Sequence, residues 1–259
     1  MNEKLATLLK GETLMVGGHR GLSGRFPENT LGAVQAAIDM GVDFVEIDIY
    51  LSKDGVPVLA HDRNLERCSN GTGLVTEHTF KELRQLDFGA YRGEQFKGTL
   101  IPTLEEFYAL LQKYPDVLMD IDVKNCDTNV EAGLAALKMA EEMGVADRCV
   151  FNSLDGRVVD ALYERIGRRV IIAPEKYPYM RNFVPGKDGT FARSWGVCML
   201  IEWLNKEYAD YLRDNGQVVG CTPADIPEQV DYALECGVII PVCNDPETFL
   251  RRMGKYKGE

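Results

Sequence analysis

Short apolar runs recur along the chain, and most of them follow a helix-like stretch that ends in glycine. Glycine suits a helix end because the left-handed backbone conformation costs it little. The runs predict eight strands, near residues 13–18, 42–50, 117–123, 148–153, 169–173, 196–202, 217–221 and 238–243. Eight alternating strand and helix units in about 250 residues are typical of a closed (β/α)8 TIM barrel. A doubly wound open sheet is the alternative, because periodicity alone does not show closure.

The stretch between the second and third predicted strands is too long for a single crossover helix. Lys53-Asp54-Gly55 is a turn signal, and residues 56–59 form a second apolar run after it. We therefore expect a hairpin that returns His61 toward the strand ends, inside a small subdomain inserted at about 52–111. No linker divides the sequence, so residues 1–259 are expected to form one domain.

Charge and cysteine usage narrow the possible partners and location. The chain has 29 basic and 40 acidic residues, a net charge of -11, which argues against nucleic acid or an anionic membrane surface as the main partner. Seven scattered cysteines without a CxxC pair favour a reducing compartment. The N-terminus lacks the apolar core of a signal peptide, and no uncharged run approaches the ~18 residues of a membrane span. We expect a cytoplasmic protein with a small-molecule partner; its oligomeric state is not predicted.

Two predicted strands carry carboxylates at alternating positions. Glu46 and Asp48 share one strand face, and Asp120, Asp122 and Lys124 share a face of the next. Buried carboxylates are costly unless they are compensated, and a hard cation such as Mg2+ or Ca2+ compensates them. The carboxylates of either strand alone could lie at a solvated strand end or form ion pairs, but two acidic strands favour a divalent metal site.

Two of the three histidines, His19 and His61, each follow an apolar run, where barrel enzymes place catalytic groups. A histidine can both take and give a proton near neutral pH. Arg20 and Lys124 add donors suited to phosphate, although each could instead form a structural salt bridge. His78 matches no such arrangement and is expected to be a surface residue.

Several motifs, taken in order, resemble the signature of the glycerophosphodiester phosphodiesterase family. They are His19-Arg20-Gly21, Pro27-Glu28-Asn29-Thr30, Glu46-Ile47-Asp48, Lys53 to Val58, His61-Asp62, Asn70-Gly71-Thr72-Gly73, Ile101 to Glu106, Asp122-Val123-Lys124 and Phe151-Asn152-Ser153. The resemblance is strong from about residue 14 to 155. It implies a (β/α)8 barrel with an inserted subdomain and the metal-dependent hydrolysis of a glycerol phosphodiester to glycerol phosphate and an alcohol.

The resemblance also implies roles for single residues. His19 and His61 would be the acid/base pair, and Arg20 and Lys124 would contact the phosphate. Glu46, Asp48 and Asp122 would bind the divalent metal, with Asp122 at a position where the family usually has Glu. The attacking group would be water or the substrate's own glycerol hydroxyl, which would give a cyclic phosphate first.

The C-terminal third departs from the family pattern. Residues 221–224 and 244–246 replace the motifs usual on the last two strands, and Leu154 stands where Phe is common. Since these positions lie at the substrate side in the family, we expect the catalytic residues to be retained and the pocket for the alcohol to differ.

Three alternative functions remain open. A phospholipase D-like enzyme would cleave a lysolipid head group with the same histidines and metal, but such secreted enzymes usually carry export signals and disulfides. A non-catalytic phosphodiester-binding barrel would not need both histidines and every carboxylate. An unrelated metal-dependent barrel hydrolase would normally use several histidine ligands, and this chain has three histidines in all.

Overall fold

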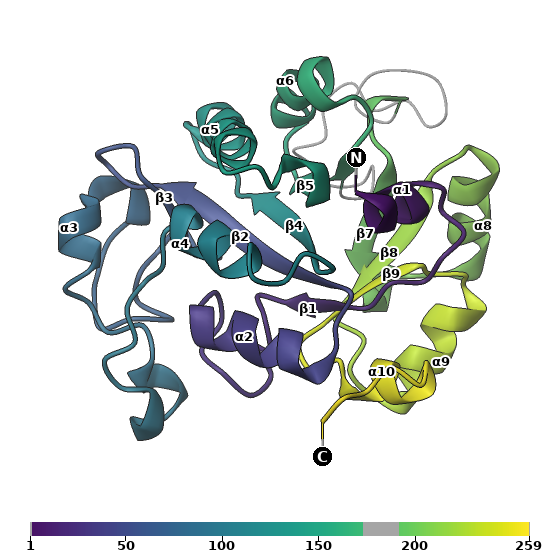
Figure 1. Ribbon diagram of the computed structural model, residues 1–259, viewed down its shortest axis with the longest axis horizontal. Coiled ribbons are helices and arrows are strands. Elements are labelled where there is room, and N and C mark those ends of the chain that lie inside the picture. The colour runs from purple at the N-terminus through teal and green to yellow at the C-terminus, as the bar shows by residue number, and fades with distance from the viewer. Residues whose placement is uncertain (1, 173–191, 259) are drawn as a thin grey trace.

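The computed structural model describes residues 2–172 and 192–258, and its strands form a closed parallel barrel. The barrel strands are β1 (Gly17–His19), β2 (Phe44–Leu51), β4 (Leu118–Val123), β5 (Cys149–Ser153), β6 (Val170–Ile172), β7 (Gly196–Leu200), β8 (Val218–Thr222) and β9 (Ile240–Cys243). Each pairs in parallel with its neighbours, and β1 closes the ring by pairing with both β2 and β9 (Figure 1). The (β/α)8 prediction is confirmed, and the open sheet is excluded.

Helices surround the strands (Figure 1). They are α2 (Leu31–Met40), α4 (Leu104–Leu111), α5 (Asn129–Glu142), α6 (Gly156–Ile166), α8 (Lys206–Asp214), α9 (Pro227–Glu235) and α10 (Glu247–Arg252). Helix α2 shows how the sequence sets both ends of a helix. At its start, Thr30 Oγ1 accepts from the backbone N–H of Ala33, and at its end Gly41 adopts φ 104°. As expected, glycines with positive φ also follow the later helices, at 144, 167, 216 and 237.

The N-terminal end of the barrel is sealed by apolar side chains. The first helix, α1 (Glu3–Leu9), packs Leu5 and Leu8 against inward side chains of the strands, including Phe44. A Cβ at Gly17 would lie 2.2 Å from the ring of Phe44, so this strand position has room only for glycine. With this end closed, polar chemistry is confined to the carboxyl ends of the strands.

The stretch after β2 forms a separate lobe at the left of Figure 1. The predicted hairpin is present: β3 (Pro57–Leu59) pairs antiparallel with the end of β2. The lobe also contains the short helix α3 (Phe80–Leu83) and has its own apolar cluster around Leu65, Val75 and Leu83. The insertion limits of about 52–111 and the single domain over 1–259 stay predictions.

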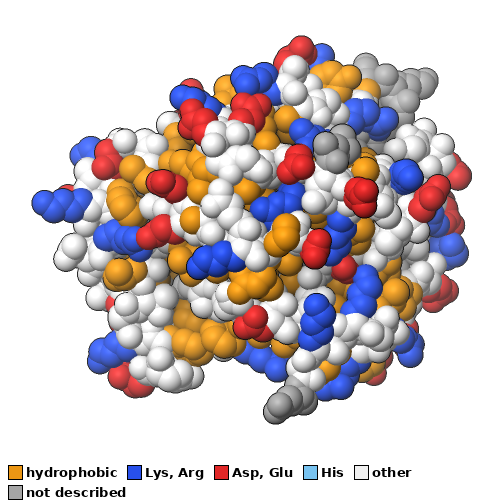
Figure 2. Space-filling model, in the orientation of Figure 1, with side chains coloured by type: hydrophobic (Ala, Val, Ile, Leu, Met, Phe, Trp, Pro, Cys, Tyr) orange, Lys and Arg blue, Asp and Glu red, His pale blue; other side chains and the backbone are white. Residues whose placement is uncertain are grey.

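The described helices are short, and charges of both signs lie on the surface. Among the residues that the structure describes, no helix combines the length and the apolar composition needed to cross a bilayer. On the face drawn in Figure 2, acidic and basic side chains are interspersed rather than gathered in one basic patch. All seven cysteines are free.

Candidate active site

The strand register brings the predicted residues to one end of the barrel. His19 lies opposite Glu46, and Asp48 lies opposite Asp122, so their side chains share the inner face of three adjacent strands. A cavity of about 190 Å3 opens there. Six of the seven predicted site residues line it: His19, Arg20, Asp48, His61, Asp122 and Lys124. Glu46, the seventh, is 4% exposed and lies two residues deeper on β2 than Asp48.

Three carboxylates converge beside this cavity. Oxygens of Glu46, Asp48 and Asp122 lie within 4.8 Å of one another. Burial and the two neighbouring aspartates raise the pKa of Glu46 well above its usual value. Asp122 Oδ1 is buried and has no hydrogen-bond partner among the described residues. An oxygen-only donor set that includes an unpartnered buried carboxylate oxygen fits a hard divalent cation.

Two cationic side chains flank the carboxylates. Lys124 Nζ lies 3.1 Å from Asp48 Oδ1 and 3.0 Å from Asp122 Oδ2, and Arg20 Nε lies 3.2 Å from Asp48 Oδ2. Burial opposes the ionisation of Asp48, but Lys124 and Arg20 outweigh it and hold the pKa of Asp48 below its usual value. The site therefore joins negative charge for a cation with positive charge for an anion.

The loop after β1 orients the carboxylates through strained backbone. Arg20 and Asn29 both have φ 56°, a region that non-glycine residues seldom adopt. The backbone N–H of Arg20 donates to Glu46 Oε2 at 2.8 Å. Asn29 Nδ2 donates to Asp48 Oδ2 at 2.7 Å, and Asn29 Oδ1 accepts from the Asp48 backbone N–H at 3.1 Å. Sequence reasoning missed this role of Asn29, whose type also suits a helix cap.

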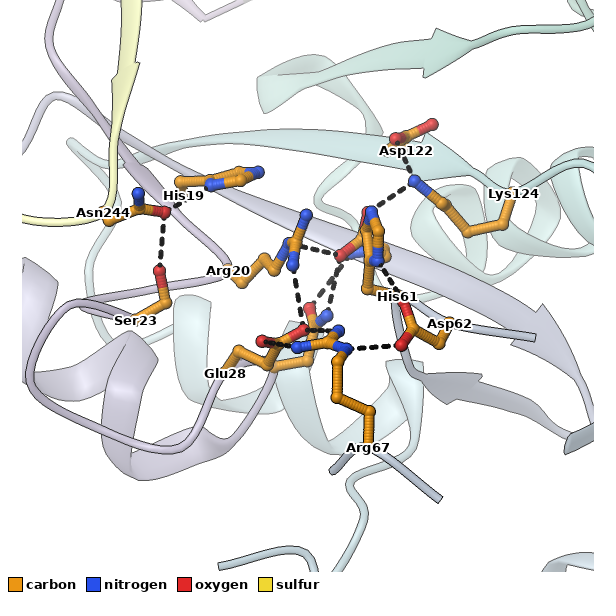
Figure 3. Close-up of polar contacts among 12 residues, drawn as sticks. His19, Arg20, Ser23, Glu28, His61, Asp62, Arg67, Asp122, Lys124 and Asn244 are labelled. Carbon is orange, nitrogen blue, oxygen red and sulfur yellow. Dashed lines mark hydrogen bonds and ion pairs between the residues drawn. The ribbon is translucent and has the colours of Figure 1, made fainter. Parts of the chain in front are cut away.

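A chain of charged groups supports His61 (Figure 3). His61 Nδ1 lies 2.6 Å from Asp62 Oδ1, and Arg67 Nε donates to Asp62 Oδ2. Arg67 also makes a two-point contact with Glu28, at 2.7 Å for each hydrogen bond, and Glu28 accepts from Arg20 at 2.9 Å. The Arg67 hydrogen bond lowers the pKa of Asp62 to about 2. Asp62 could have been suggested by its place beside His61, whereas no sequence pattern marks Arg67.

His19 has a different support (Figure 3). Its Nδ1 lies 2.7 Å from Asn244 Oδ1, which also accepts from Ser23 Oγ at 3.1 Å. Burial and the neighbouring Arg20 lower the pKa of His19 to about 4, so its ring is neutral near neutral pH.

The rest of the cavity wall is mainly uncharged. It consists of Asn152, Leu154, Cys198, Met199, Leu200, Trp203, Thr222 and Pro223. Leu154, Thr222 and Pro223 thus lie at the cavity, as expected for altered positions, but Asn244 contacts His19 instead of lining the wall. His78 lies away from the site in the insertion, where its Nε2 is 3.0 Å from the Thr72 carbonyl oxygen.

Known proteins are similar to this chain in sequence and architecture. The sequence model of the Glycerophosphoryl diester phosphodiesterase family matches residues 19–216. A glycerophosphodiester phosphodiesterase of Caldanaerobacter subterraneus is 28% identical over 253 residues, covering 94% of this chain and 99% of the relative. The crystal structure of the Thermotoga maritima glycerophosphodiester phosphodiesterase is 25% identical, with a TM-score of 0.73 over 93% of this chain and 99% of that one. An Oleispira antarctica phosphodiesterase, solved with its product sn-glycerol-3-phosphate, shares the fold with a TM-score of 0.82 at 22% identity, over 95% of this chain and 99% of that one. The chain therefore belongs to the glycerophosphoryl diester phosphodiesterase family.

Proposed function

We propose that the chain hydrolyses a small glycerophosphodiester to glycerol phosphate and an alcohol, with His19 and His61 as the acid/base pair. The observation that carries this proposal is the convergence of both histidines, Arg20 and Lys124 on one cavity beside three carboxylates. The named product of the Oleispira antarctica phosphodiesterase supports glycerol phosphate as the product here.

Glu46, Asp48 and Asp122 would hold a divalent cation, Mg2+ or Ca2+. Their oxygen-only donor set and the unpartnered Asp122 oxygen fit either ion. When bound, the cation supplies Lewis-acid polarisation of a phosphoryl oxygen. Arg20 already neutralises part of the charge on Asp48 and would also receive the anionic phosphate.

Lys124 and Arg20 would bind the substrate phosphate, because both line the cavity and carry a full positive charge. Phosphate oxygens entering the cavity would share these cations with Asp48 and Asp122, which offsets part of the cost of leaving water. The same donors would stabilise the extra negative charge that develops on phosphate oxygens during the reaction.

The histidines would move the protons. Each has Nδ1 directed to an oxygen acceptor, Asn244 for His19 and Asp62 for His61. This arrangement leaves Nε2 of each ring for the reacting groups. One Nε2 would take a proton from the attacking hydroxyl or water, and the other would give a proton to the leaving alcohol.

We also propose that the enzyme works in the cytoplasm on a small molecule and not on nucleic acid. The seven free cysteines and the net charge of -11 support this proposal. The uncharged cavity wall around Leu154, Met199 and Trp203 leaves cleavage of a lysolipid head group as the second candidate function.

A substrate panel tests the reaction. The full chain would be assayed with glycerophosphodiesters of choline, ethanolamine, glycerol and inositol, and with lysophosphatidylcholine, each with Mg2+, Ca2+ or a chelator. We expect glycerol phosphate and free alcohol from at least one glycerophosphodiester, and no turnover with the chelator. Faster turnover of lysophosphatidylcholine would favour the second candidate, and absence of alcohol release throughout would leave only a binding role. A cyclic phosphate in the early products would identify the glycerol hydroxyl as the attacking group.

Single substitutions test the two histidines. We expect His19→Ala and His61→Ala each to lower kcat by about 10²- to 10⁴-fold, the usual contribution of a positioned general acid or base. His78→Ala is the matched control, since His78 lies in the insertion away from the cavity. A kcat near that of the wild type in either of the first two variants would remove that histidine from the mechanism.

A further inference from the structure

The amide of Asn244 connects His19 to a carboxylate that the proposed mechanism does not use. Asn244 Oδ1 lies 2.7 Å from His19 Nδ1, and Asn244 Nδ2 donates to Asp225 Oδ2 at 2.9 Å. His19 is the last residue of β1, and Asn244 and Asp225 follow the carboxyl ends of the neighbouring strands β9 and β8. His19, Asn244 and Asp225 therefore form a short hydrogen-bonded relay, which transfers no proton, at the carboxyl ends of these strands.

The chemistry of the relay decides which way the amide points. An amide group has a donor end and an acceptor end, whereas an ionised carboxylate only accepts. Asp225 therefore attracts the NH2 end of Asn244 and turns the oxygen toward His19. An oxygen at that position requires a proton on Nδ1, so the neutral ring of His19 keeps its lone pair on Nε2.

Asp225 is itself held in place by contacts that do not involve His19. Its Oδ1 accepts from the backbone N–H of Asp245 at 3.0 Å, and its carbonyl oxygen accepts from Thr248 Oγ1 at 2.9 Å. On the other side, the backbone N–H of Gly24 donates to the carbonyl oxygen of Asn244 at 2.8 Å. A Cβ at Gly24 would lie 2.9 Å from that oxygen, so the loop after β1 sits directly on the loop after β9.

We propose that Asp225, acting through Asn244, is a positioning residue that selects the His19 tautomer with the proton on Nδ1. This inference deepens the proposed function and rests on the proposed role of His19 in proton transfer. It assigns a task to the segment 244–246, which departs from the family pattern and does not line the cavity. Asp225 does not touch the reacting groups and acts only through the orientation of Asn244.

The substitution Asp225→Asn separates this role from simple packing. The backbone N–H of Asp245 still needs an acceptor, so the oxygen of the new amide stays there and its NH2 group faces Asn244. Asn244 then turns its own oxygen toward position 225 and its NH2 group toward His19. Nδ1 becomes an acceptor, and the ring proton moves to Nε2, which then has no lone pair with which to accept a proton.

The test measures the tautomer and the kinetics of the full chain. Nitrogen-15 NMR of labelled histidine resolves the rings because the chain has three histidines, and His19→Ala identifies the His19 signals. We expect a proton on Nδ1 in the wild type and on Nε2 in Asp225→Asn. We also expect kcat of Asp225→Asn to fall by about 10- to 100-fold, with KM within about twofold.

Two further variants keep the proposal falsifiable. Asn244→Ala removes the acceptor and should give mixed tautomers with a similar fall in kcat. Asp245→Asn is the matched control, because this neighbouring carboxylate pairs with Arg25 and does not face His19; it should keep the wild-type tautomer and kcat. An unchanged His19 tautomer in Asp225→Asn, or a folded Asp225→Asn protein with wild-type kcat, would overturn the proposal. Because the tautomer is read without substrate, failure of the proposed reaction would show separately, as a wild type that releases no alcohol.

Discussion

The two histidines at the barrel mouth are supported in opposite ways. His61 directs Nδ1 to the carboxylate of Asp62, which also accepts a hydrogen bond from the guanidinium of Arg67. His19 directs Nδ1 to the neutral amide of Asn244, which in turn donates a hydrogen bond to the carboxylate of Asp225. The His61–Asp62 pair is partly exposed and lies in the insertion. The His19–Asn244 pair joins residues that are 225 positions apart in the chain, where β1 and β9 close the barrel.

The comparison shows that the tautomer of each histidine depends on two groups: the acceptor at Nδ1 and the side chain that hydrogen-bonds to this acceptor. A carboxylate presents oxygen in any orientation, so Asp62 can accept from His61 and from Arg67 at once. An amide presents oxygen only on one side, so Asn244 works because Asp225 binds its NH2 end. Asparagine is therefore suitable beside His19 and would be unsuitable beside His61.

The largest expected effect comes from Asp62→Asn, which places an amide beside His61 as Asn244 already does beside His19. Arg67 would attract the oxygen of the new amide, so its NH2 group would face His61 Nδ1 and place the ring proton on the wrong nitrogen. A wrong tautomer in a comparable histidine and carboxylate pair costs about 10⁴-fold in kcat. We expect a loss of about 10²- to 10⁴-fold, measured as kcat at saturating substrate.

A double substitution provides the control for that explanation. In Asp62→Asn with Arg67→Met, no guanidinium holds the amide oxygen, and the amide can turn its oxygen back toward His61. We expect the double variant to be more active than Asp62→Asn alone, although it lacks one more charged group. If the double variant is equal to or slower than the single variant, tautomer selection is not the cause of the loss.

Arg67→Met alone should have a smaller effect. Asp62 keeps its oxygen toward His61 but loses the hydrogen bond that fixes its side chain, and Glu28 loses its two-point contact. We expect kcat to fall by about tenfold and Arg67→Lys to restore part of it, since lysine supplies the charge without the planar fork. Arg63→Met is the matched control on the same loop, and it should behave as the wild type. A change confined to KM would show that Arg67 acts on substrate binding instead.

The sequence predicted the parts of the site that follow from periodicity. Alternation along β2 and β4 placed Glu46, Asp48 and Asp122 on one face, and closure of the barrel then set the three carboxylates beside His19. The turn at 53–55 likewise predicted the hairpin that carries His61 back.

Apart from Asp62, which is next to His61 in the chain, the supports could not be predicted because no local pattern encodes them. Asn244 meets His19 only when β9 closes against β1, and the segment 244–246 suggested a substrate contact instead. Arg67 lies on an irregular loop, where neither strand nor helix periodicity constrains a side chain. Asparagine is a common helix-cap residue, but the side chain of Asn29, which has a positive φ, contacts Asp48, and Thr30 caps the helix.

The smallest expected effect is a pH-dependent difference in stability between the wild type and Arg67→Met. Arg67 lowers the pKa of Asp62 to about 2, and together with Arg20 it also lowers the pKa of Glu28 against the opposing effect of burial. A carboxylate whose pKa is lowered by folding contributes stability above its unfolded pKa of about 4 and loses it as the pH falls through the folded value. Arg67 is partly exposed, so we expect the variant to unfold about 2–4 °C below the wild type near neutral pH, equivalent to about 1 kcal/mol. That gap should close between about pH 4 and pH 2 in thermal unfolding followed by circular dichroism, whereas a gap that stays constant with pH would mean that Arg67 stabilises the loop by packing and not by its charge.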